Sequence, residues 1–114
     1  MDRYTFTLVI DKPLTFQSYS GFAVRGVFFN LLRKFSEGKA EALHARKGLA
    51  PYSTTPLERF RGGVKRVVYR RLNGPALATL SFTLLEKDLS EAFRELALQG
   101  HLNEVELVNN NYQV

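Results

Sequence analysis

His44 stands beside two cations, Arg46 and Lys47, just before Gly48, a residue type suited to end a helix. An imidazole can transfer a proton near neutral pH, and neighbouring cations can stabilise the charge on a five-coordinate phosphorus. RNA carries its own nucleophile, the 2′-hydroxyl, so these side chains would suffice for phosphodiester cleavage. The alternative is a surface histidine that interacts with the C-terminal dipole of its helix. His44 and Lys47 are therefore the candidate catalytic residues.

A second candidate site is a basic stretch interleaved with apolar side chains. Its cations are Arg59, Arg61, Lys65, Arg66, Arg70 and Arg71. Side chains alternate along a strand, so these cations project on both faces, as in a protruding loop or hairpin that grips a phosphate backbone. The alternative is an edge hairpin whose charges prevent aggregation. With Arg25 and Arg46, these six cations form the predicted RNA-binding set.

Composition narrows the classes of function. The 114 residues fit one domain, and the net charge of +5 favours a polyanionic partner. The chain has no cysteine and only two histidines, which removes thiol chemistry and disfavours a metal site, so we expect no metal or other cofactor. It has neither a long apolar run nor a signal-peptide pattern, so we expect a cytoplasmic protein without a membrane segment.

Hydrophobic periodicity predicts alternating strands and helices. The expected elements are a strand over 3–10, a helix from Ser18 or Ser20 to Phe35, a short helix over 39–46, an extended segment over 50–57, strands over 64–72 and 76–86 joined by an Asn73-Gly74 hairpin, a helix over 88–100 and a strand over 104–108. The stretch 59–63 is predicted to be a mobile turn.

Two stripes are predicted on the first helix. Its core stripe consists of Val24, Val27, Phe28, Leu31 and Phe35. Arg25, Phe29 and Arg33 recur every four residues, so they line a different stripe. Gly26, inside this helix, serves either close packing against a strand or close approach of a ligand backbone.

The order of elements predicts the fold class. A βαββαβ order is the split-βαβ, ferredoxin-like pattern, shared with RNA-recognition motifs. It predicts an α+β domain in which two helices pack on one face of an antiparallel sheet. A standard RNA-recognition motif is disfavoured, because its RNP1 octamer is missing. A regulatory or dimerisation module of this topology remains an alternative, against which the basic charge counts.

Residues 21–57 resemble the N-terminal part of CRISPR repeat-RNA endoribonucleases of the RAMP superfamily. The resemblance rests on an ordered combination of short elements: Val24-Arg25-Gly26, Leu43-His44, Lys47-Gly48 and Pro51-Tyr52-Ser53 followed by Pro56-Leu57. It covers about a third of the chain at the level of motifs.

The resemblance implies metal-independent cleavage of CRISPR repeat RNA to 5′-hydroxyl and 2′,3′-cyclic phosphate ends. His44 matches the histidine that acts as general acid or base, and Lys47 lies near a supporting lysine. Some members use a tyrosine on the first helix, where this chain has Phe29. Phe cannot transfer a proton, so a non-catalytic RNA-binding subunit of a CRISPR effector complex is the alternative.

The resemblance also implies that residues 1–114 form the N-terminal half of a protein with two ferredoxin-like domains. The last residues, Tyr112, Gln113 and Val114, read as the start of a strand that has no partner. In isolation the domain should then either self-associate, as in a homodimer, or leave this tail disordered. We also expect it to bind repeat RNA weakly on its own.

Overall fold

The structure is a computed structural model, which describes residues 2–16, 19–46, 48, 50–61, 64–107 and 110–114. Its elements follow one another in this order: β1 Asp2–Ile10, β2 Leu14–Thr15, α1 Ser20–Phe35, α2 Glu37–Ala45, β3 Tyr52–Thr54, β4 Glu58–Arg61, β5 Val64–Val67, β6 Arg71–Leu72, β7 Ala76–Leu84, α3 Lys87–Leu98, β8 Glu104–Leu107 and β9 Asn110–Gln113. The fold is α+β and ferredoxin-like, as predicted.

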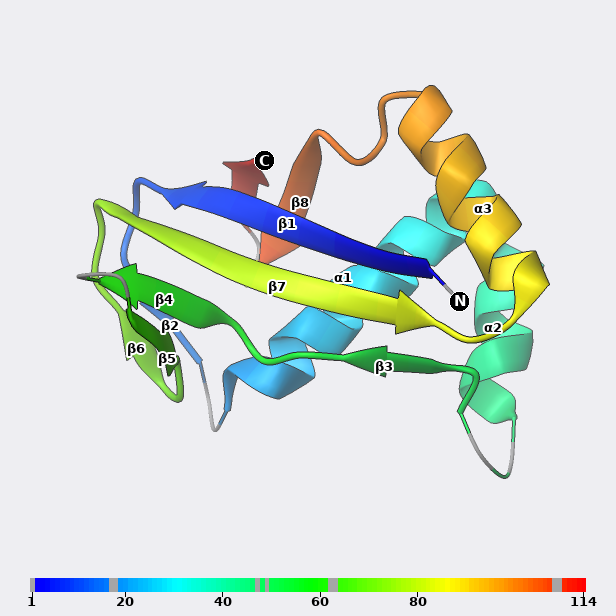
Figure 1. The fold of residues 1–114 in the computed structure, drawn as a ribbon, viewed down its shortest axis with the longest axis horizontal. Helices are drawn as coiled ribbons and strands as arrows, with labels where there is room; N and C mark the ends of the chain where they lie inside the picture. The colour runs from blue at the N-terminus through cyan, green and yellow to red at the C-terminus, as the bar shows by residue number, and fades with distance from the viewer. Residues whose placement is uncertain (1, 17–18, 47, 49, 62–63, 108–109) are drawn as a thin grey trace.

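The main sheet is antiparallel and is built around β7. β1 pairs with one edge of β7 along its whole length, and the other edge pairs first with β4 and then with β3. β5 extends this sheet beyond β4. α1 and α3 lie together behind the sheet, and α2 packs against α1 (Figure 1). The helices therefore cover one face, as the βαββαβ order predicts.

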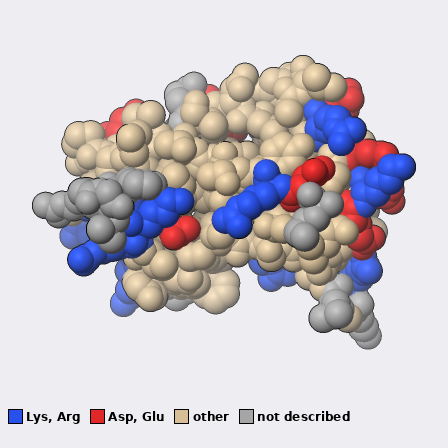
Figure 2. Space-filling model, in the orientation of Figure 1, with Lys and Arg blue, Asp and Glu red and all other residues tan. Residues whose placement is uncertain are grey.

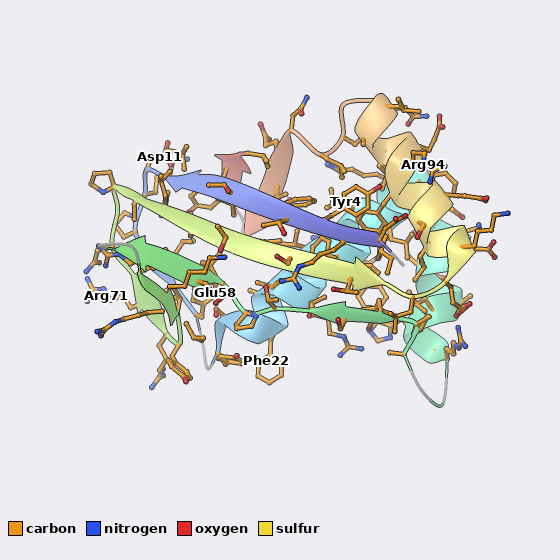
Figure 3. The ribbon with its side chains drawn as sticks, in the orientation of Figure 1. Tyr4, Asp11, Phe22, Glu58, Arg71 and Arg94 are labelled. Atoms are coloured by element: carbon orange, nitrogen blue, oxygen red, sulfur yellow. The ribbon has the colours of Figure 1, made fainter. Side chains whose placement is uncertain are left out.

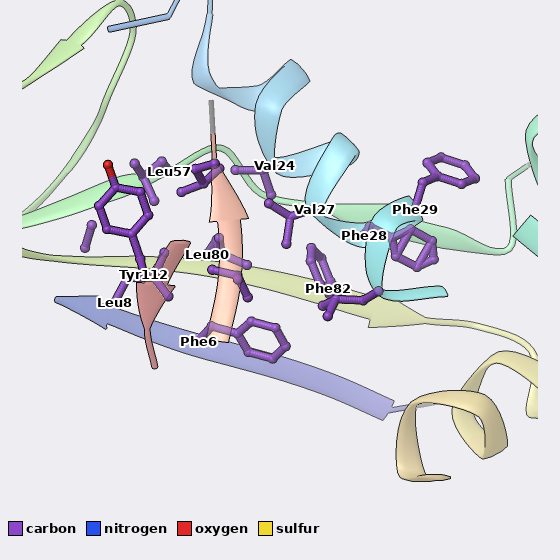
Figure 4. Packing of buried hydrophobic residues seen from close by; sticks show 14 of the residues in the cluster. Phe6, Leu8, Val24, Val27, Phe28, Phe29, Leu57, Leu80, Phe82 and Tyr112 are labelled. Atoms are coloured by element: carbon purple, nitrogen blue, oxygen red, sulfur yellow. The ribbon is translucent and has the colours of Figure 1, made fainter. Parts of the chain in front are cut away.

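Aromatic rings fill the space between the sheet and α1. Phe28 is stacked between two other rings, with centroids 4.5 Å from Tyr52 and 5.3 Å from Phe93. Phe82 and Phe6 on the sheet continue the cluster edge-to-face (Figure 4). Burial of apolar surface is the main stabilising contribution to a domain, and each of these rings adds a large area to it.

The predicted hairpin between 64–72 and 76–86 is wrong. β5 pairs with β4, β6 pairs with β2, and β7 pairs with β1. When β7 pairs with β1, the apolar side chains of both strands lie on the same buried face of the sheet. This burial outweighs the local preference of Asn73-Gly74 for a hairpin turn. Gly74 instead lets two backbone segments approach each other closely, because a Cβ there would lie 2.7 Å from the carbonyl oxygen of Ile10.

Three smaller predictions are also corrected. Residues 59–61 belong to β4 rather than to a mobile turn, and 62–63 lie outside the described residues. Phe35, predicted in the core stripe, is 38% exposed at the last residue of α1. Ser20 is not a side-chain cap of α1, since its hydroxyl is used elsewhere, and Ser18 lies outside the described residues.

The C-terminal strand has a partner after all. β9 pairs with β8, with Tyr112 opposite Val105, and both side chains are buried. This hairpin is separate from the main sheet and packs on α1 and β1. The predicted last strand is therefore present, but the predicted unpaired tail is wrong. No helix in the described part of the chain is both long and apolar enough to span a membrane.

Candidate active site

A cavity of about 210 Å³ lies between α1 and the end of α2. His44 lines it together with side chains of α1 that recur at helical spacing, namely Phe22, Arg25, Phe29 and Arg33, and with the backbone of Gly26. The second stripe predicted on α1 therefore faces the candidate catalytic histidine, and its middle residue, Phe29, also belongs to the hydrophobic core. One imidazole and two guanidinium groups thus share one cavity, a composition suited to a phosphodiester.

The Phe29 ring contacts both His44 and Arg25. Its ring centroid lies 5.2 Å from that of His44 and 5.5 Å from the guanidinium carbon of Arg25. The Arg25 contact is a cation–π interaction, which fixes the direction of a long side chain. Phe29 itself is buried, because it also packs against Phe28 and Tyr52.

Tyr52 has a positioning role that the sequence did not indicate, although its ring was one of the five tyrosines that could stack on bases. Arg25 Nε donates a hydrogen bond to the Tyr52 hydroxyl at 3.3 Å. Stacking on Phe28 holds the Tyr52 ring, so the core positions Arg25 through one aromatic side chain. Residues 25 and 52 are far apart in sequence, and the only available signal was the Pro51-Tyr52-Ser53 element.

Gly26 contributes open space rather than close packing. A Cβ built at this position would meet no atom within 4 Å. The predicted use in packing against a strand is therefore wrong, because the residue faces the cavity. A bare helix backbone at a cavity wall lets a ligand backbone approach more closely than any side chain would.

His44 lies in the last turn of α2, and its side chain is exposed. The helix begins two residues earlier than predicted, because the Ser36 side chain accepts a hydrogen bond from the Lys39 amide at 3.2 Å. Lys47, the second candidate catalytic residue, lies outside the described residues. Arg46 forms an ion pair with Glu86 and lines a different cavity, next to the start of α3.

The other predicted RNA contacts gather at the opposite end of the sheet from α2. Figure 2 shows Lys and Arg side chains over the region of β4, β5 and β6. Arg59 and Arg66 lie directly opposite each other in the β4–β5 pairing. Like charges in such a pair repel, so a polyanion between them would stabilise the hairpin.

The cations of the basic stretch differ in what surrounds them. Arg59 Nε is buried and has no hydrogen-bond partner among the described residues. Lys65, Arg66, Arg70 and Arg71 are exposed, and Arg71 Nε donates to the Asn73 side chain at 3.2 Å. Arg61 lies in β4, but its side chain is outside the described part of the structure. Within the described residues, no group of His, Asp and Glu side chains is placed to hold a metal ion.

No protein-family model matches the sequence, and a search of curated proteins gives no match. A solved structure of a Cas6 product complex is similar, with a TM-score of 0.60 and 22% sequence identity. The match covers 97% of this chain and 37% of that chain. The chain thus spans little more than a third of the length of the structure it matches. It has a Cas6-like fold, which is the fold implied by the resemblance to CRISPR repeat-RNA endoribonucleases.

Proposed function

We propose that this protein is the N-terminal domain of an endoribonuclease that cleaves CRISPR repeat RNA. One observation carries the proposal, namely the cavity that brings the imidazole of His44 together with Arg25 and Arg33. The likeness to a solved structure of a Cas6 product complex supports it. The net charge of +5 and the exposed cations around β5 and β6 suit an RNA partner.

The proposed reaction is an internal transesterification at one phosphodiester. The 2′-oxygen attacks the adjacent phosphorus and loses its proton to a base, while the bond from phosphorus to the 5′-oxygen breaks. The departing 5′-oxygen takes up a proton, leaving a 5′-hydroxyl and a 2′,3′-cyclic phosphate. His44 performs one of these two proton transfers. Arg25 and Arg33 stabilise the additional negative charge on the five-coordinate phosphorus.

Arg25 is held for this role before RNA binds. Its Nε is engaged by Tyr52 and its plane lies near the ring of Phe29, so its terminal amino groups can bind a phosphate oxygen. Preorganised donors lower the free-energy barrier because they do not have to reorient during the reaction. With Phe29 in place of a tyrosine, His44 is the proton-transfer group in the cavity.

The active unit is proposed to include a second ferredoxin-like domain, which would complete the RNA-binding groove. The match to only 37% of a Cas6 chain supports this proposal. The natural polypeptide should therefore cleave repeat RNA faster than the 114-residue domain does. Assembly into a larger CRISPR complex through the same domain remains a further proposal.

The test is to incubate the natural polypeptide with the repeat RNA of its source organism in EDTA and to map the RNA ends. We expect one cut with a 2′,3′-cyclic phosphate, and no cut in RNA carrying a 2′-deoxynucleotide at that position. His44→Ala should slow cleavage by roughly 10²–10⁴-fold while binding is retained. His101→Ala, at the other histidine, is the matched control. Tight binding without any cleavage would indicate the RNA-binding subunit instead.

A further inference from the structure

Three aromatic rings form a continuous surface beside the candidate active site. The Tyr19 ring lies 6.0 Å from that of Phe22, edge-to-face, and 5.6 Å from that of Tyr69. Phe22 is 68% exposed and Tyr69 is 65% exposed. Phe22 projects from the first turn of α1 at the edge of the molecule (Figure 3). We call Tyr19, Phe22 and Tyr69 the aromatic surface.

The backbone that carries this surface is pinned by hydrogen bonds. The Ser20 hydroxyl, which is buried, donates to the Val68 carbonyl and accepts from the Leu57 amide at 3.2 Å. The Val68 amide donates to the Leu57 carbonyl at 2.7 Å. Two residues after Val68, the Arg70 carbonyl accepts a hydrogen bond from the Phe16 amide at 2.7 Å. Tyr69 is therefore an exposed ring on a fixed segment.

Gly21 makes room for the middle ring. A Cβ at this position would lie 2.5 Å from a ring carbon of Tyr19, closer than real contacts allow. Tyr19 can therefore lie over the first turn of α1 only because residue 21 has no side chain. The sequence thus provides a specific position for a ring that contacts both exposed aromatic residues.

The aromatic surface lies between the cavity and the basic region. Phe22 lines the cavity that contains His44, Arg25 and Arg33. At the other end, Tyr69 directly precedes Arg70 and Arg71, whose side chains are exposed. A strand of RNA that runs from the cavity to these cations would therefore pass over the aromatic rings.

We propose that the aromatic surface is a stacking site for an unpaired nucleobase next to the cleaved phosphate. The inference deepens the proposed function and rests on it for the identity of the ligand as RNA. Nucleobases stack on exposed aromatic rings, and single-stranded RNA is bound by this combination of rings and cations. Rings fixed in advance lose little conformational freedom on binding, which favours stacking.

The first test compares two probes that carry the same phosphates. One is an oligoadenylate of about 12 nucleotides, and the other is the corresponding abasic oligomer. Phe22→Ala in the 114-residue protein should weaken binding of the oligoadenylate by roughly 5- to 100-fold and leave binding of the abasic oligomer unchanged. Phe35→Ala, at another partly exposed phenylalanine of α1, is the matched control and should change neither. Equal losses on both probes would overturn the proposal.

The second test uses the absence of tryptophan from the chain. Phe22→Trp keeps a stacking ring and introduces a single indole, which can be excited at wavelengths that the five tyrosines do not absorb. We expect its fluorescence to be quenched by the oligoadenylate and not by the abasic oligomer. An emission maximum typical of a buried indole in the free protein, without quenching by either RNA, would show that another protein surface covers Phe22. That outcome would overturn the proposal.

The two proposals fail in distinguishable ways. If repeat RNA is bound but not cleaved, the oligoadenylate and abasic probes still decide the stacking site. If repeat RNA is cleaved through His44 but Phe22→Ala and Tyr69→Ala bind the oligoadenylate as tightly as the parent does, only the stacking site is wrong. Both residues are largely exposed, so neither substitution leaves a core cavity that could unfold the domain.

Discussion

Arg25 Nε and the Tyr52 hydroxyl are 3.3 Å apart, and this hydrogen bond joins the middle of α1 to the first residue of β3. Tyr52 is itself stacked on Phe28 in the core. Arg25 is therefore oriented by a residue of β3 held in the core, as well as by Phe29 on its own helix. The contacts with the Tyr52 hydroxyl and the Phe29 ring fix the orientation of the guanidinium group, and so set where its remaining N–H donors point.

Tyr52→Phe should slow cleavage without unfolding the protein. The substitution keeps the stacked ring and removes only the acceptor of Arg25. A hydrogen bond of this kind contributes about 0.5–1.5 kcal/mol, which corresponds to roughly 2- to 13-fold in rate. Single-turnover kinetics on repeat RNA measure the effect. Tyr4→Phe, at a half-buried tyrosine that packs on Phe93, is the control, and equal rates in all three proteins would show that Tyr52 does not position Arg25.

Gly26→Ala should make the domain more stable and less active. Alanine lowers the backbone cost of a helix interior by about 0.5–1 kcal/mol, and no atom within 4 Å opposes its Cβ. The same methyl group would protrude into the cavity beside His44. Thermal unfolding and RNA cleavage together check the two effects. Gly38→Ala in α2 is the matched control, and a stabilised Gly26→Ala protein with undiminished cleavage would show that RNA does not approach this backbone.

Replacing Arg66, Arg70 and Arg71 with alanine should weaken RNA binding broadly across sequences. Each phosphate contact that is lost from single-stranded RNA flattens the slope of log K against log salt by about 0.7. A salt titration of the binding constant measures this change. Arg94→Ala, on α3 at the other end of the molecule in Figure 3, is the control. An unchanged slope in the triple variant would assign these charges to a passive surface.

Tyr112→Phe should reduce the loss of stability at alkaline pH. Burial, and secondarily the charge of Asp11, raise the pKa of Tyr112 above its ordinary value of 10.0. The folded state thus favours the neutral hydroxyl. Its contribution to the free energy of unfolding is complete below pH 10 and is lost as the pH rises through the folded pKa.

At neutral pH the same substitution should leave the free energy of unfolding unchanged or raise it. The Tyr112 hydroxyl is buried and has no hydrogen-bond partner among the described residues, so it carries a desolvation cost. Denaturant unfolding at pH 7 and between pH 10 and 11 measures both effects. Tyr69→Phe, at an exposed tyrosine, is the control, and an alkaline loss in Tyr112→Phe equal to that of the parent would contradict the prediction.

Local patterns predicted the elements whose apolar period is strong. Val24, Val27, Phe28 and Leu31 place α1 correctly, and all four are buried. The Asn73-Gly74 signal failed, because the choice of strand partner depends on which apolar faces match across the sheet. No property of the residues around position 73 contains that information.

The candidate site was predictable only in part, for the same reason. His44 and the stripe of Arg25, Phe29 and Arg33 could be identified from residue type and spacing. The positioning role of Tyr52 could not, because it depends on where β3 lies relative to α1. The aromatic surface likewise combines Tyr19 and Tyr69, residues that only the folded chain brings together.

Position 20 requires a small side chain that can both donate and accept a hydrogen bond, and Ser20 meets this requirement. One oxygen atom both receives the Leu57 amide and gives its proton to the Val68 carbonyl, in a place without solvent access. Alanine would leave an amide and a carbonyl unpaired, cysteine is a poor donor and acceptor, and threonine adds a methyl group at a fully buried position. In a mutational scan, position 20 should therefore tolerate fewer replacements than the positions that line the cavity beside His44, although Ser20 is not one of them.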